Sequence, residues 1–150
     1  MTQKLCVVGS KNGSTIEALR VATVYIRGCT ELHHRDCVGT DTQIHNIAHT
    51  LRKPVVTHPS TVPYSRAYSE YYDTRVACDP VNRDRGLVEE CDTFIVLHSS
   101  TTVTNTSNTY KFIQMVNVYG KSATVIYNNG STQIFKPGHT DQPTPVELSK

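Results

Sequence analysis

HHRDCVGTDTQIHNIA, residues 33–48, is the stretch that decides the fold. It starts at the end of a predicted strand, residues 31–34, crosses a tight glycine loop and enters a helix. The apolar residues of that helix follow the i, i+3, i+4, i+7 spacing of one helix face: Ile44, Ile47, Ala48 and Leu51. A strand, a short loop and a helix start in this order predict one unit of an α/β fold.

The start of this helix is also a candidate anion site. Thr40 or Asp41 is predicted to cap it, because a short oxygen side chain can accept a backbone N–H of the first turn. Gly39 allows the tight loop, and the remaining N–H groups of the first turn point in one direction. Such a helix start binds phosphate. An ordinary strand-to-helix connection is the alternative interpretation.

The rest of the chain alternates between strands and helices. Short apolar runs predict strands at residues 5–8, 55–57, 93–97 and 123–127, and residues 75–78 read as a short extended piece. Helices are expected from Ser14 or Thr15 to Gly28, over residues 81–90 with Asp79 as cap and Pro80 at the first position, and over residues 109–119.

Asn128-Asn129-Gly130 is a hairpin turn signal that leads into a last strand, residues 131–135. The predicted fold class is therefore α/β, a three-layer Rossmann-like fold with a mostly parallel open sheet and a C-terminal antiparallel hairpin edge. Residues 1–135 are expected to form one domain. Residues 136–150 lack a core pattern and are expected to be a flexible tail.

Composition narrows the class of partner. The formal charge of the 150-residue chain is +2, so charge alone does not predict nucleic-acid binding. No segment has the apolar length that a membrane-spanning helix needs. The N-terminal residues lack the cleavage pattern of a secretory signal peptide. Five cysteines are scattered singly, which indicates reduced thiols and therefore a cytoplasmic protein.

Ligands of open parallel sheets sit at the carboxyl ends of the strands. Five polar stretches are predicted to share that rim: residues 9–14, 34–41, 58–66, 82–85 and 98–108. They are rich in glycine, hydroxyl, asparagine and arginine, which suits phosphates and ribose hydroxyls better than an apolar ligand.

Three segments resemble motifs of a known superfamily. The N-terminal GS, the central HHRDCVGTDTQIHNIA and the later VNRDRGLVEECDTFIVL look like the SLOG superfamily, over about residues 4–127. This superfamily of Rossmann-like domains includes the DNA-uptake protein DprA, the LOG phosphoribohydrolases and sensor domains of bacterial immunity. The resemblance implies a nucleotide-derived ligand.

Two departures from that pattern bear on activity. Arg35 stands where related chains often carry glycine. The loop HSSTTVTNTSNT after residues 93–97 lacks the acidic residue of the phosphoribohydrolases, and cleaving a glycosidic bond needs carboxylates. Asp36, Asp41 and Asp84 remain as possible acids. Asp41 is expected to cap the helix that follows it, and Asp84 is expected to lie on the solvent face or beside an arginine.

The hypothesis is therefore a binding protein that holds, and by analogy sequesters, an ADP-ribose-type or cyclic-nucleotide immune signal without turnover. A stand-alone viral (phage) or mobile-element anti-defence protein fits that analogy, and its location would then be the host cytoplasm. The alternatives are a nucleotide N-glycosidase resembling the phosphoribohydrolases and a DprA-like DNA-binding module. A homo-oligomer is expected, with no membrane partner and with DNA disfavoured.

The predicted ligand-binding residues come from all five rim stretches. They are Gly9, Ser10, Lys11, His34, Asp36, Gly39, Thr40, Asp41, His58, Asn82, Arg83, Ser99, Thr104, Asn105, Thr106 and Ser107. No catalytic residue, cofactor or metal is assigned. His33, His34, Cys37, His45 and His49 could supply zinc ligands, but no paired-cysteine motif accompanies them.

Three further features bear on the candidate site. Residues two apart on a helix diverge, so only one of Arg83 and Arg85 can face a pocket fully, and the resemblance favours Arg83. Cys37 beside a histidine is either a nucleophile or, more commonly, a small buried thiol. The cluster Tyr64, Tyr68, Tyr71 and Tyr72 is either core, a dimer interface or a stacking surface for a base.

Overall fold

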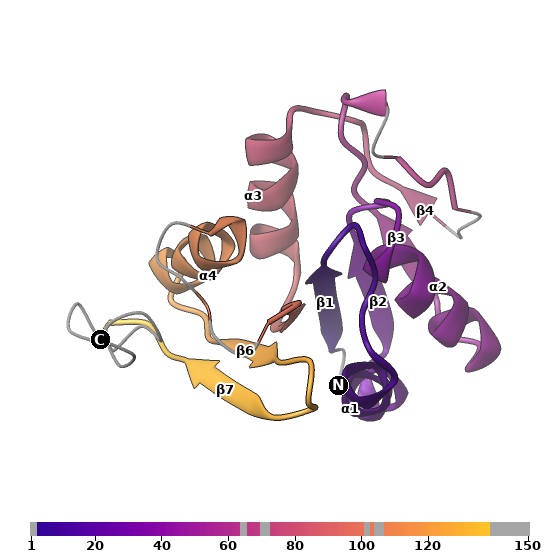
Figure 1. Ribbon diagram of the computed structural model, residues 1–150. Coiled ribbons are helices and arrows are strands. Elements are labelled where there is room, and N and C mark those ends of the chain that lie inside the picture. Colours follow the sequence, from indigo (N-terminus) through magenta and orange to yellow (C-terminus); the bar gives the residue numbers. More distant parts are fainter. Residues whose placement is uncertain (1–2, 64–65, 70–72, 101–102, 104–106, 139–150) are drawn as a thin grey trace.

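The computed structural model describes residues 3–63, 66–69, 73–100, 103 and 107–138. These residues form one seven-stranded sheet with the order β4-β3-β2-β1-β5-β6-β7 (Figure 1). The strands are β1 Lys4–Gly9, β2 Glu31–His34, β3 Val55–Thr57, β4 Asp73–Thr74, β5 Thr93–Leu97, β6 Ala123–Ile126 and β7 Thr132–Phe135. Neighbouring strands are parallel except for β6 and β7, so the predicted fold class is confirmed.

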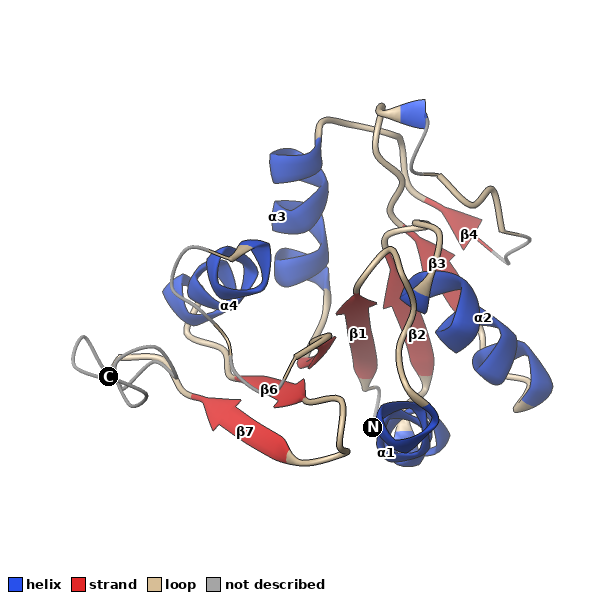
Figure 2. Ribbon diagram, viewed as in Figure 1, coloured by secondary structure: helices blue, strands red, loops and turns tan. Residues whose placement is uncertain are grey.

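In the described part of the chain, four helices cover the two faces of the sheet (Figure 2). They are α1 Ile16–Gly28, α2 Thr40–Thr50, α3 Pro80–Glu90 and α4 Asn108–Val118. One core lies under α1 and α2 and the other under α3 and α4, which makes the three layers. Among the described residues, no helix is long and apolar enough to cross a bilayer.

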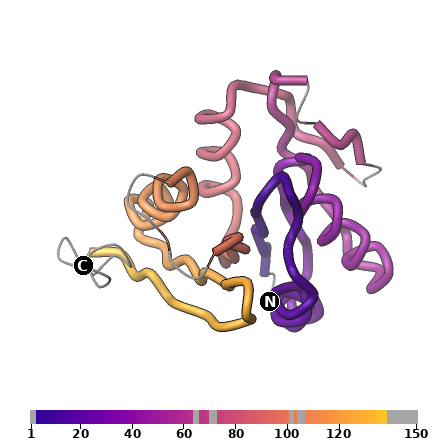
Figure 3. The backbone as a smooth tube through the Cα atoms, in the orientation of Figure 1, coloured from indigo at the N-terminus to yellow at the C-terminus, as the bar shows by residue number. Residues whose placement is uncertain are grey.

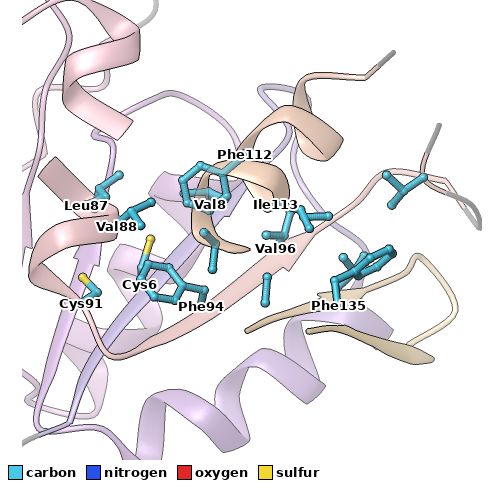
Figure 4. Close-up of a cluster of buried hydrophobic side chains, with 14 of the residues drawn as sticks. Cys6, Val8, Leu87, Val88, Cys91, Phe94, Val96, Phe112, Ile113 and Phe135 are labelled. Carbon is cyan, nitrogen blue, oxygen red and sulfur yellow. The ribbon is translucent and has the colours of Figure 1, made fainter. Parts of the chain in front are cut away.

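The sheet contributes side chains to both cores, because successive side chains along each strand point to opposite faces. In β1, Leu5 and Val7 join the core with α1 and α2, whereas Cys6 and Val8 join the core with α3 and α4. Figure 4 shows the latter core, where Val8 lies among Leu87 and Val88 of α3 and Phe112 of α4. Because β1 is apolar on both faces, it is the central strand.

The strands are added first on one side of β1 and then on the other. The chain adds β2, β3 and β4 on one side of β1, and then crosses through α3 to add β5, β6 and β7 on the other side. The tube in Figure 3 shows this division, with the indigo-to-purple chain in one half and the orange-to-yellow chain in the other. β1 and β5 therefore flank the topological switch point of the sheet.

Helix caps explain where three helices begin. The side chains of Thr15, Asp79 and Ser107 accept backbone N–H groups of α1, α3 and α4 respectively. The predicted cap of α2 is wrong: Gly39 is the N-cap and makes no side-chain bond. Asp41 instead turns back, and its Oδ2 accepts the N–H of Cys37 at 3.0 Å.

Two other predictions from the sequence concern the short extended piece and the C-terminal tail. The extended piece predicted at residues 75–78 forms earlier, as β4, because Asp73 and Thr74 pair with Val56 and Thr57 of β3. Of the expected tail, residues 136–138 belong to the described part of the chain, and residues 139–150 lie outside it.

Candidate functional site

A cavity of about 860 Å³ lies at the carboxyl ends of β1 and β5, at the switch point. Its volume suits a small-molecule ligand. Each of the five polar stretches predicted to share this rim contributes to it. The polar and charged lining residues are Ser10, Lys11, Arg35, Ser60, Arg83, Asp84, His98, Ser99, Ser107, Asn108, Thr109 and Lys111.

The lining is strongly basic. Four basic side chains from four different segments converge on it: Lys11, Arg35, Arg83 and Lys111. Asp84 is the single carboxylate among the described lining residues. Because low-dielectric walls strengthen the field of such a cluster, the cavity attracts anions.

Arg83 holds the position that the sequence assigned to it. It lies at the cavity and is 7% exposed, whereas Arg85 is exposed and hydrogen-bonds Asn82 Oδ1. The helical twist separates the two side chains, as expected. Asn82 does not line this cavity, because its amide is bound to Asp79 at the cap of α3.

Asp84 bridges two of the cations. Its Oδ1 lies 2.8 Å from Arg83 Nε and 4.0 Å from Arg35 Nη1. The predicted pairing of Asp84 with an arginine is therefore confirmed. Arg35 also donates from Nη2 to the carbonyl of Gly9 at 3.2 Å. Burial lowers the pKa of Arg35, but the negative charges of Asp41 and Asp84 outweigh it and the net shift is upward.

Gly9, Ser10 and Lys11 line the cavity, but Gly39 and Thr40 lie behind this loop instead of in the lining. A Cβ on Gly9 would meet Thr40 at 2.4 Å, and a Cβ on Gly39 would meet the carbonyl oxygen of Lys11 at 2.2 Å. The two loops are thus packed backbone to backbone. The loop after β1 covers the first turn of α2. The helix starts that reach the cavity are those of α3 and α4.

Asp36 and His34 point into the protein. Asp36 is fully buried, and its carboxylate accepts the N–H of Ser69 at 2.9 Å and pairs with Arg66 at 3.2 Å. Its φ of 56° lies in the left-handed region, which Asp tolerates better than most residues. Both carboxylate oxygens hold the segment 66–69 in place, so Asp36 has a structural role and lies outside the lining.

His34 and His58 are buried in two separate pairs. His34 Nε2 bonds His45 Nδ1 at 2.9 Å, and His58 Nε2 bonds His33 Nδ1 at 2.8 Å. Burial lowers the pKa of His34 to about 3 and that of His58 to about 4, so both are neutral at pH 7. Neither lines the main cavity.

Two more buried groups lie close to the cavity. Burial raises the pKa of Asp41 to about 6, and its Oδ1 has no hydrogen-bond partner. Burial also raises the pKa of the Cys37 thiol, which lines the cavity. Cys37 is therefore the small buried thiol of the two alternatives, since a nucleophile needs a thiolate. All five cysteines are free thiols.

The loop after β5 is described in part. Ser99 and Ser107 line the cavity, and His98 Nδ1 lies 3.0 Å from the Thr109 hydroxyl. The predicted residues Thr104, Asn105 and Thr106 lie outside the described residues, as do Tyr64, Tyr71 and Tyr72. Tyr68 is 61% exposed, with the Arg66 guanidinium 4.2 Å from its ring centre.

Two basic lining residues, Arg35 and Lys111, are absent from the predicted ligand-binding set. Arg35 directly follows the strand of residues 31–34, and a cation in that position is a usable signal of a rim site. Lys111 lies in the first turn of α4, where a basic residue opposes the helix dipole. Arg83 lies in the first turn of α3 in the same way, so a basic residue in a first helical turn marks both of these cavity residues.

Comparisons with known proteins identify no family for this chain. No protein-family model matches it, and no curated protein matches its sequence at a significant level. The site therefore has to be interpreted from its own geometry.

Proposed function

We propose that this protein binds a nucleotide-derived small molecule and holds it without chemical change. The observation that carries the proposal is the convergence of four basic side chains on one cavity at the switch point of a Rossmann-like sheet. Phosphate groups are the biological anions that best match such a cluster of arginine and lysine.

The two walls of the cavity suit the two ends of a nucleotide. Arg35, Arg83 and Lys11 gather at the carboxyl end of β1 and at the start of α3, where they would contact phosphate. Phe112 and Met115 of α4 supply an apolar surface on which a base can pack. Serine and threonine hydroxyls along the rim suit ribose.

The decisive experiment is to denature the purified protein and identify released small molecules by mass spectrometry. A phosphorylated nucleoside derivative in near-stoichiometric amount is the expected result. The stripped protein is then titrated by calorimetry with AMP, ADP-ribose and a cyclic dinucleotide. No released compound together with no heat from any of these would refute the proposal.

Asp84 supports a second candidate, a nucleotide N-glycosidase, because it places one carboxylate at the cavity. Its carboxylate is already engaged by the guanidinium groups of Arg83 and Arg35, which occupy the atoms that a substrate would need. We expect AMP and NAD to stay intact during long incubation with the protein. Release of free base that Asp84→Asn abolishes would establish the enzyme instead.

A further inference from the structure

A second cluster of polar side chains lies apart from the main cavity. His33 comes from β2, His58 follows β3 and Glu90 is the last residue of α3. One ligand atom of each lies within 4.8 Å of the other two. His33 and His58 are buried and Glu90 is partly buried. We propose that these three residues form a binding site for a divalent transition-metal ion of the zinc class.

The separations fit tetrahedral coordination. His33 Nδ1 is 2.8 Å from His58 Nε2, which in turn is 3.6 Å from Glu90 Oε1. Zinc bonds to nitrogen and oxygen ligands are about 2.0–2.2 Å long, so ligand atoms around a tetrahedral ion lie about 3.3 Å apart. The observed distances fall on both sides of that value. The third separation, between His33 and Glu90, is at most 4.8 Å, so a movement of the partly buried Glu90 carboxylate toward the two histidines completes the set.

The orientation of His33 is already that of a metal ligand. Its Nε2 hydrogen-bonds Glu31 Oε1 at 2.5 Å. A carboxylate at one ring nitrogen keeps the proton there and leaves the lone pair of the other nitrogen available. In this protein the other nitrogen is Nδ1, which faces His58. Histidine ligands of metal sites are held by carboxylates in the same way.

The cluster opens onto a small cavity of about 180 Å³, which supplies a coordination position for water. His58 and Glu90 line it, together with Arg75 and Cys78. Two histidines, one carboxylate and an open position are a ligand set that binds zinc.

Arg75 competes with the ion for Glu90. Its guanidinium binds both carboxylate oxygens, with Nε 3.0 Å from Oε1 and Nη2 in contact with Oε2. The Arg75 side chain is 39% exposed, so it can move toward solvent when a cation binds. Removal of its positive charge should therefore strengthen metal binding, whereas removal of a ligand should weaken it. A merely structural ion pair gives no such opposite effects.

The test uses the full chain, stripped of metal with a chelator and titrated with Zn²⁺ against a chromophoric competitor. We expect one equivalent to bind. Glu90→Gln and His58→Ala should each weaken binding by about tenfold or more, since even the groups that support metal ligands contribute that much. Arg75→Gln should tighten binding. His49→Ala is the matched control, because His49 is exposed and outside the cluster.

Circular dichroism of each metal-free variant checks that it is folded. Glu90→Gln keeps the test decisive if His58→Ala fails to fold. Titration with Co²⁺ should give the intense visible absorption of a tetrahedral site, and Glu90→Gln should abolish it. Equal Zn²⁺ affinity in wild type, Glu90→Gln and His49→Ala would overturn the proposal, as would the absence of stoichiometric binding.

Discussion

The backbone N–H of Thr40 donates to the carbonyl oxygen of Ser10 at 2.9 Å. This bond joins the loop after β1 to the first turn of α2. It places Ser10 and Lys11 at the cavity and closes off the helix start behind them. The position of Lys11 therefore depends on the close approach of two backbones.

Gly39→Ala should disturb this junction. A Cβ at Gly39 would lie 2.2 Å from the Lys11 carbonyl oxygen, at a φ of 85°. Gly120 is the matched control, because its φ is 75° but no atom lies within 4 Å of its Cβ position. We expect Gly120→Ala to cost about 1 kcal/mol of unfolding free energy and Gly39→Ala about 3 kcal/mol. Urea unfolding measures both, and equal losses would show that the loops are not tightly packed.

Arg83→Ala should weaken binding of the identified nucleotide. A charge-assisted hydrogen bond contributes about 1.5–3 kcal/mol, so the expected loss is roughly ten- to a hundredfold. Arg83→Lys should restore part of the affinity, because lysine lacks the planar fork. Arg85→Ala is the control, as its side chain is exposed and bound to Asn82. Calorimetry measures the affinities. Equal nucleotide affinity in Arg83→Ala and wild type would show that Arg83 does not contact the ligand.

The stability of the protein should depend on the protonation of Asp41. Burial raises the pKa of Asp41 to about 6 from 3.8. A raised pKa means that the folded state binds the proton more tightly, so this contribution is full below pH 3.8 and is lost as the pH rises through about 6. The shift of about two units corresponds to about 3 kcal/mol.

Asp41→Asn removes this titration and imitates the neutral acid. Between pH 4 and pH 7, the unfolding free energy of wild type should fall by about 2–3 kcal/mol relative to Asp41→Asn. Urea unfolding of both proteins at the two pH values measures the difference. A difference that stays constant across this range would contradict the burial effect.

Asp36 should matter for stability and little for ligand chemistry. Asp36→Ala leaves the Ser69 N–H and the Arg66 guanidinium without their buried partner, which costs about 3–5 kcal/mol. Asp36→Asn keeps an acceptor and tolerates the positive φ, so it should cost less. Asp73→Ala is the control, because the Asp73 side chain is 58% exposed and such surface pairs contribute little. Thermal unfolding should rank the three variants in this order.

The sequence by itself determined most of the elements and the polar rim. The apolar run of residues 93–97 predicts β5 with its observed bounds, because a buried parallel strand is apolar on both faces. Asp79 and Pro80 start α3 as expected, because this cap is made locally, from the Asp79 side chain to the N–H of Asn82. The five polar stretches meet because parallel strands end at one edge of the sheet.

Only the tertiary structure decided which side chains of residues 34–41 face the cavity. Asp36 and Gly39 come from the same loop as Arg35, yet Asp36 turns inward to residues 66–69 and Gly39 packs on Lys11. These contacts depend on how separate loops fit together, which a local pattern does not encode. The same holds for His33, His58 and Glu90. Strand register and the crossover through α3 bring them together, because side chains far apart in the sequence meet only when the sheet is assembled.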